Sequence, residues 1–105
     1  MRLLSQELRQ SLPSLGSQRG MADPMVHAKF WIPDINWIWY VIEGQMSRQG
    51  YTFYGYVIGL DEEWEGFSLS ELEVVRGPNG QRVHSDHNFT AEFWSKIRSR
   101  MTNSL

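Results

Sequence analysis

Alternation of apolar and polar residues in the first part of the chain predicts β-strands. Over 25–32, every second residue from Val26 to Ile32 is apolar, which is typical of a strand with one buried face. The run 37–43 is apolar on both faces, so we expect a central strand that is covered twice. A third strand is expected over 51–60, where two glycines leave room for neighbouring aromatic rings. These runs predict an antiparallel meander.

Apolar residues at helical spacing predict a helix near each end of the chain. Within 3–12, Leu4, Leu8 and Leu12 recur at every fourth position, and Pro13 ends that pattern. A second helix is expected from Thr90 to about residue 101, packed onto the sheet through one stripe. The expected N-caps are Ser5 and Thr90, and the expected stripe of the last helix is Phe93, Ile97 and Met101.

The segment between the third strand and the last helix is expected to be mostly loop. Residues 61–66 predict an acidic loop, and Ser68 with Glu71 forms a capping box that starts a short helix over 69–75. Residues 81–89 are expected as a short edge strand or an extended loop. The chain is thus predicted to be one α+β domain, 1–105, with a small antiparallel three- to four-stranded meander packed against N- and C-terminal helices.

Composition narrows the function classes. The chain has no Cys, which excludes disulfides, thiol catalysis and Cys-based zinc sites. The start of the chain is too polar for a signal peptide, and no apolar run approaches the length of a membrane span, so we expect a cytoplasmic protein without a membrane partner. Net charge is −2, and six of the twelve acidic residues lie between Asp61 and Glu73. This acidic stretch is either an ordinary solvated loop or a docking site for a basic partner.

Catalytic and metal-binding patterns are missing from the sequence. No nucleophile turn and no phosphate-binding glycine motif occurs, so we expect no catalytic residues, no cofactor and no enzymatic activity. His84 and His87 stand three apart with Asp86 between them, but an extended segment does not by itself aim two rings at one metal ion. No metal site is therefore predicted.

Two alternatives to a protein-binding role are kept open. Exposed aromatic residues on a sheet stack bases, so Trp31, Tyr54 and Lys29 define a single-stranded nucleic-acid hypothesis, against which the acidic net charge counts. Polar residues beside an aromatic wall also suggest a small hydrolase or transferase site near Asp34 and Glu43 that uses a histidine.

Several short motifs follow one another along the chain: Lys29-Phe30, Pro33-Asp34, Asn36-Trp37, Trp39-Tyr40, Phe67-Ser68-Leu69-Ser70-Glu71-Leu72 and Arg76-Gly77. In this order they resemble those of an uncharacterised bacterial family, a domain of unknown function carried on plasmids, integrative elements and phages. The resemblance covers about the first 90 residues, and only Asp86 is kept where family members tend to carry Glu-Arg-Asp. It implies no activity and no catalytic residues.

We therefore expect a non-enzymatic protein-binding accessory factor of a mobile element or phage. Its partner is expected to be a host or mobile-element protein, with inhibition of a host defence complex (CRISPR or restriction) as one form of this role. Exposed strand edges also allow a homodimer. The predicted binding residues form two groups, Lys29, Trp31, Asp34 and Asn36 in the first, and Asp61, Glu62, Glu63, Trp64 and Glu65 in the second.

Overall fold

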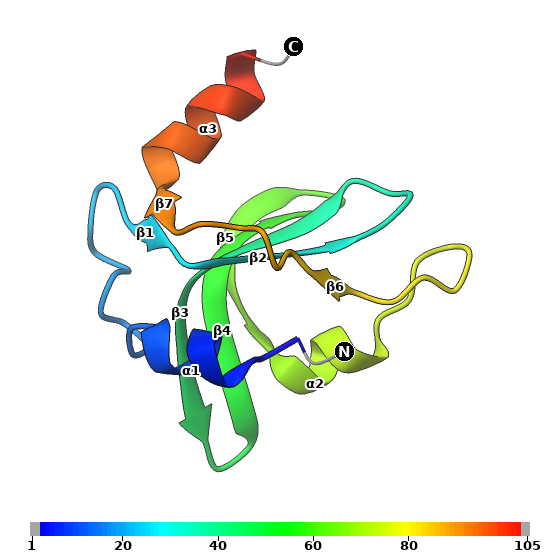
Figure 1. The fold of residues 1–105 in the computed structure, drawn as a ribbon, viewed down its shortest axis with the longest axis horizontal. Coiled ribbons are helices and arrows are strands. Elements are labelled where there is room, and N and C mark those ends of the chain that lie inside the picture. The colour runs from blue at the N-terminus through cyan, green and yellow to red at the C-terminus, as the bar shows by residue number, and fades with distance from the viewer. Residues whose placement is uncertain (1–2, 104–105) are drawn as a thin grey trace.

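Five antiparallel strands form the central sheet, as seen in a computed structural model that describes residues 3–103 (Figure 1). Strands β2 to β5 follow one another as a meander, and β6 pairs with the outer edge of β2, which gives the order β5-β4-β3-β2-β6. A separate two-stranded sheet pairs β1 with β7. The strands are β1 (Met25–Val26), β2 (Ala28–Ile32), β3 (Trp37–Ser47), β4 (Gly50–Ile58), β5 (Glu62–Ser68), β6 (His84–Ser85) and β7 (Glu92–Phe93).

The α+β class is confirmed, but the expected strand count and the acidic loop are corrected. The segment expected as a loop over 61–66 mostly forms β5, whose register runs from Ile58↔Glu62 to Thr52↔Ser68. An acidic run has low strand propensity, but pairing with the apolar strand β4 on one side overrides it. Within 81–89, only β6 is a strand of the sheet.

Both faces of the sheet are covered, as the two-sided pattern of β3 predicts. One core contains Phe30, Trp39 and Phe53, and the leucines of α1 (Gln6–Ser11) and α2 (Leu69–Val74) pack against it. The other core contains Tyr40, Ile42 and Tyr56, and α3 (Trp94–Asn103) covers it through Ile97. Figure 1 shows α1 and α2 together at one end of the molecule and α3 at the other.

Helix caps are set partly by local sequence and partly by distant residues. Ser5 and Ser68 cap α1 and α2 as predicted, since their hydroxyls accept from the N–H groups of Leu8 and Glu71 at 3.1 Å. Thr90 is not the cap of the last helix. The N–H of Ser95 instead donates at 2.8 Å to Oδ1 of Asp23, which lies 72 positions earlier in the chain.

The expected buried stripe of the last helix is wrong at its first residue. Phe93 belongs to β7 and is 47% exposed, whereas Trp94 begins α3 and packs into the second core. Ile97 is buried and Met101 is half-buried, as expected. The shift arises because the pairing of β7 with β1 delays the start of the helix.

Candidate functional site

The acidic residues lie along an outer edge of the sheet. β5 pairs with β4 on one side, and no other described strand pairs with its second side. We call Asp61, Glu62, Glu63 and Glu65 the acidic edge, and all four are exposed. Alternation along β5 places Glu63 and Glu65 on one face and Glu62 on the other.

The carboxylates of the acidic edge differ in whether a positive charge lies beside them. Glu62 accepts a hydrogen bond from the Tyr56 hydroxyl at 3.1 Å and lies 3.5 Å from the Arg98 guanidinium. Glu63 and Glu65 have no ion pair with another residue in the described part of the chain. Partial burial, together with the charges of Glu63 and Glu71, raises the pKa of Glu65. A cation is therefore favoured at the Glu63–Glu65 side of the edge.

Trp64 is half-buried in a cluster of aromatic rings and does not project as a free anchor. Its ring lies parallel to that of Tyr54 at 6.3 Å and edge-on to Tyr56 and Trp94, each at 5.2 Å. Such pairs add packing energy beyond simple burial. The cluster joins β4, β5 and α3, so Trp64 has a structural role in addition to any role in binding.

A cavity of about 240 Å³ opens beside this cluster. Its walls include Tyr54, Trp64 and Trp94, and Met21 at its border is 57% exposed. The guanidinium of Arg19 stacks over the Tyr54 ring, 3.7 Å from the ring centre. We call this space the aromatic cavity. It lies next to the acidic edge because Trp64, which lines the cavity, stands between Glu63 and Glu65 on β5.

The other group of predicted binding residues lies toward the opposite edge of the sheet from β5. Lys29 and Trp31 are on β2, where the Trp31 ring lies 5.6 Å from the His84 ring. Asp34 and Asn36 lie in the turn to β3, and the Asp34 carboxylate accepts from the Gln81 amide at 3.1 Å. Three strand spacings separate β2 from β5, roughly 14 Å. The two predicted groups are therefore separate surfaces.

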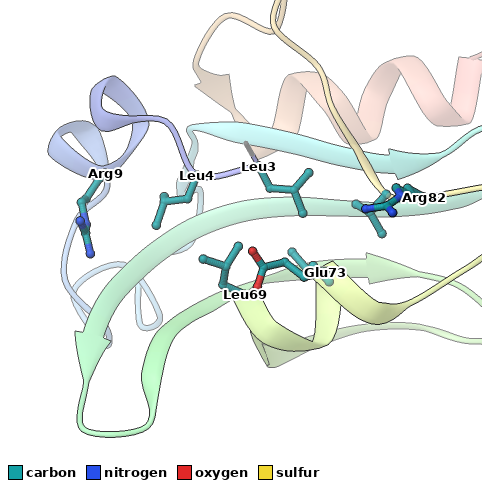
Figure 2. Close-up of a pocket in the computed structure, with 8 residues that line it drawn as sticks. Leu3, Leu4, Arg9, Leu69, Glu73 and Arg82 are labelled. Atoms are coloured by element: carbon teal, nitrogen blue, oxygen red, sulfur yellow. The ribbon is translucent and has the colours of Figure 1, made fainter. Parts of the chain in front are cut away.

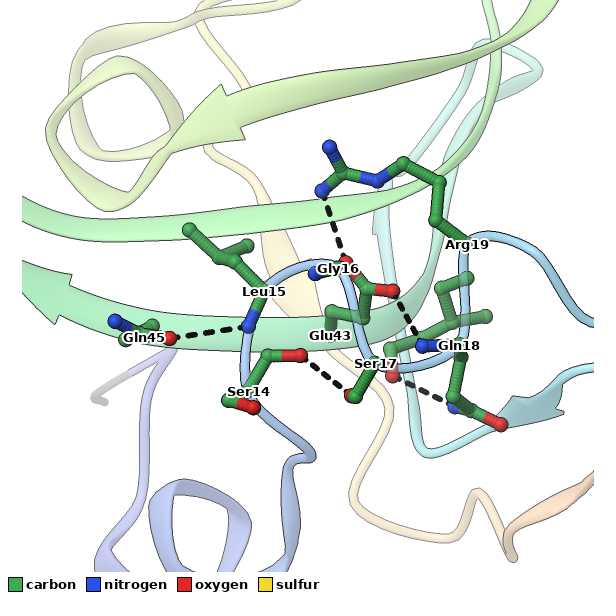
Figure 3. Close-up of polar contacts among 9 residues, drawn as sticks. Ser14, Leu15, Gly16, Ser17, Gln18, Arg19, Glu43 and Gln45 are labelled. Carbon is green, nitrogen blue, oxygen red and sulfur yellow. Dashed lines mark hydrogen bonds and ion pairs between the residues drawn. The ribbon is translucent and has the colours of Figure 1, made fainter.

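Glu43 is the buried carboxylate of the molecule's central strand. Its side chain is 0% exposed and accepts hydrogen bonds from Gly16 N at 2.7 Å, Gln18 N at 2.8 Å and Arg19 Nη2 at 2.9 Å (Figure 3). Charged donors and backbone N–H groups together satisfy a carboxylate that burial would otherwise destabilise. Glu43 therefore fastens the loop before β1 to β3.

The Gln18 side chain completes this attachment. Its amide nitrogen donates to the carbonyls of Met25 and Ile42, and its oxygen accepts from Met25 N, all at 2.8 Å. Nearby, Gln45 accepts from Leu15 N at 3.1 Å (Figure 3). All these groups are used within the protein, so we assign the Glu43 cluster to loop anchoring and not to substrate binding.

Asp34 and Glu43 do not meet in one site. Glu43 is the seventh residue of β3, and Asp34 lies in the turn before that strand, so about 20 Å of extended chain, from Trp37 to Glu43, lies between them. The described residues contain no group of three His, Cys, Asp or Glu side chains that could hold a metal ion. These placements give the hydrolase hypothesis no shared polar pocket.

The three residues of the nucleic-acid hypothesis do not form one open platform. Trp31 and Lys29 are on β2 and Tyr54 is on β4, with β3 between them. One face of the Tyr54 ring is covered by Arg19, and Trp64 lies parallel to the ring. Tyr54 is thus engaged in internal packing.

A further cavity of about 410 Å³ lies between the start of the chain and α2 (Figure 2). Leu3, Leu4 and Leu69 give it apolar walls, and Arg9 and Arg82 lie at its two ends. None of the predicted binding residues lies here. Sequence reasoning missed this cavity because its walls come from segments far apart in the chain.

No helix within residues 3–103 is long and apolar enough to cross a bilayer.

The fold and its surfaces define a small α+β protein with a two-sided core and an acidic sheet edge. The chain belongs to the family described as "Protein of unknown function (DUF2958)", whose sequence profile matches residues 3–99. The search of curated proteins found no match, and the search of solved structures found none either.

Proposed function

We propose that this protein is a non-enzymatic protein-binding module whose edge strand β5 takes an extended, basic segment of a partner. The observation that carries the proposal is an acidic strand edge directly beside an aromatic cavity. An extended peptide adds to such an edge through backbone hydrogen bonds, and side-chain pockets then supply specificity.

Charge complementarity selects the kind of partner. Glu63 and Glu65 repel each other, and Glu71 adds to the negative field at Glu65. Lys or Arg side chains on a neighbouring strand would relieve this repulsion. A second copy of β5 would increase it, so the charges favour a basic partner over pairing of β5 with itself.

The aromatic cavity supplies the apolar contact that such an interface needs. Interfaces gain most of their affinity from a few side chains inserted into desolvated pockets, with charged groups around them. Trp64 points from β5 into this region, and Trp94 and Met21 extend the apolar surface. One apolar side chain of the partner strand would occupy the cavity while its basic neighbours face the acidic edge.

The wider setting of the proposal is a cytoplasmic accessory factor of a mobile element or phage that binds a host or element protein, such as a component of a defence complex. This setting is supported by the motif resemblance described above and by no feature of the site. The binding surface and the setting can therefore fail independently.

A defined peptide tests the surface. We would titrate a labelled peptide of alternating Lys and Val residues and follow anisotropy and amide hydrogen exchange in β5. We expect binding that protects β5 and that is lost in Glu63→Lys/Glu65→Lys. The matched control, Glu7→Lys/Glu73→Lys, makes the same charge change at exposed positions on α1 and α2 and should bind normally.

Three results would contradict the proposal. One is an equal loss of affinity in both double variants, because the peptide would then respond to the overall charge of the protein and not to β5. Another is protection of a different element, and a third is tighter binding of a single-stranded oligonucleotide than of the peptide. A photo-crosslinker at position 63 then identifies natural partners, and a crosslinked segment that is acidic or helical would count against β5 addition.

A further inference from the structure

A third cavity, of about 450 Å³, lies between β2, β3 and the segment that leads into α3, away from the β5 edge of the sheet. Lys29 on β2 and Tyr40 on β3 are direct cross-strand neighbours and both line it. We call it the Lys29–Tyr40 cavity. Asp86, Phe89, Ala91, Glu92 and Arg100 contribute to the rest of its lining.

Tyr40 is the unusual member of this lining. The residue is only 6% exposed, and its hydroxyl forms no hydrogen bond with another residue of the described part of the chain. No buried side-chain oxygen or nitrogen among residues 3–103 lacks a partner, so this hydroxyl is the accessible end of the side chain. Burial raises the pKa of this hydroxyl, so the group stays protonated and able to donate at neutral pH. A hydroxyl at the accessible end of a buried ring, beside a cavity and without an internal partner, is available to donate to a ligand atom.

Lys29 supplies a free positive charge beside that hydroxyl. Its ammonium lies 5.9 Å from the centre of the Tyr40 ring and forms no ion pair within the described part of the chain. Arg100 brings a second cation, which binds Glu92 through two hydrogen bonds, at 2.8 and 2.5 Å. The pairing cancels the charge of Glu92 but leaves further N–H groups on the guanidinium.

Asp86 contributes the acceptor side of the lining. One carboxylate oxygen accepts from Asn88 N at 3.0 Å, which holds the turn before α3, and the other oxygen has no partner in residues 3–103. The lining thus combines donors at Lys29, Tyr40 and Arg100 with an acceptor at Asp86. A bare inorganic anion would use only the donors and would be repelled by Asp86.

We propose that the Lys29–Tyr40 cavity binds a small hydroxylated organic anion, with its carboxylate or phosphate held by Lys29 and Tyr40 and a hydroxyl donating to Asp86. The cavity volume is large enough for a molecule of several heavy atoms and too large for a lone ion. Phe89 and Ala91 provide apolar walls for its carbon skeleton. This site is independent of the β5 surface and of the proposed partner.

Ligand titrations followed by amide NMR test this inference. The probes are glycerol phosphate, glycerate and uncharged glycerol, each at constant ionic strength. We expect saturable shifts around residues 29, 40 and 86–92 with at least one of the two anions and none with glycerol. Binding of one anion and not the other would identify the charged group.

Matched variants give the test its specificity. Lys29→Gln should weaken binding about tenfold and Tyr40→Phe about fivefold, the effect of losing one charged and one neutral hydrogen bond. Lys96→Gln removes the same charge from exposed α3, and Tyr51→Phe removes a hydroxyl on the opposite face of the sheet, so both should bind normally. Asp86→Asn should bind a bare phosphate ion more tightly than the unmodified protein does.

Several outcomes would overturn the inference. Failure of both anions to give saturable shifts would do so, and so would equal loss of binding in Lys29→Gln and Lys96→Gln. Glycerol binding as tight as that of the anions would show that the charge is not recognised. None of these outcomes bears on the β5 surface, which is tested with the peptide.

Discussion

The carboxylate of Glu43, fully buried on β3, accepts a hydrogen bond of 2.9 Å from Arg19, whose side chain is 46% exposed. The pair joins the core to a loop that carries no regular helix or strand. The same arginine stacks on Tyr54, so the contact also positions the wall of the aromatic cavity. The stability of the loop and the shape of that cavity are therefore linked.

Glu43→Ala should lower the free energy of unfolding by about 3 kcal/mol or more, because it leaves the N–H groups of Gly16 and Gln18 and the Arg19 charge without their acceptor. Urea unfolding measures this change. Gln45→Ala is the control, two residues later on β3, and it removes one exposed hydrogen bond, with a cost of about 1 kcal/mol at most. Equal losses in the two variants would contradict the anchoring role.

Gly55→Ala should destabilise the protein by at least about 2 kcal/mol, because a Cβ at this position would lie 1.9 Å from the carbonyl oxygen of Tyr40. The strand backbone would have to move, since that oxygen is not part of a flexible side chain. Gly66→Ala, on neighbouring β5, meets only Phe53 O at 3.6 Å and should change stability by no more than about 0.5 kcal/mol. Thermal unfolding of both variants compares them directly.

Asp23→Ala should cost about 1 kcal/mol, since it removes the acceptor for the Ser95 N–H at the start of α3. The amides of the first turn of α3 should then exchange faster with solvent, while those of α1 keep their rates. Asp23→Asn retains a side-chain oxygen and should behave much like the unmodified protein. Unchanged exchange in α3 after Asp23→Ala would show that the distant cap is dispensable.

Glu65→Gln should raise the melting temperature at pH 7. Burial and neighbouring acids raise the pKa of Glu65 above its usual 4.5 on folding, so the folded state binds this proton more tightly and stability is lost as pH rises through the folded value. The gain should vanish below about pH 4, where the carboxyl is protonated in both states. Glu62→Gln is the contrasting variant and should lower the melting temperature at pH 7, because Glu62 has Arg98 and Tyr56 as partners.

Sequence patterns predicted the core of the sheet correctly, since burial on β2, β3 and β4 follows the alternation of apolar residues. Val41 is 0% exposed on one face and Ile42 1% exposed in the core of the other. The alternation fails at Glu43. An irregularity in the β3–β4 register between Val41 and Glu43 pairs Glu43 with Tyr54, on the face where the loop lies. Regular strand parity cannot predict such a bulge.

The candidate sites show the same division. Residue type alone identified the acidic stretch and Trp64, but strand pairing decided that they form a sheet edge beside a cavity. The sequence predicts Lys29 as a binding residue, whereas its neighbour Tyr40 lies in the run 37–43, for which the sequence predicts burial on both faces. Only the position of the 86–92 segment shows that the Tyr40 hydroxyl reaches a cavity.

The sequence by itself determined the first three strands of the meander, β2 to β4, two of the helix caps and the absence of thiol chemistry, because each depends on periodic burial, local hydrogen bonds or composition. Tertiary structure decided the partners of Glu43, Gln18 and Asp23, which lie 24 or more positions apart in the chain from the groups that they bind, except for the contacts of Gln18 with Met25. The physical reason is that a buried polar group must find a donor or acceptor somewhere in the folded chain, and local sequence does not specify where.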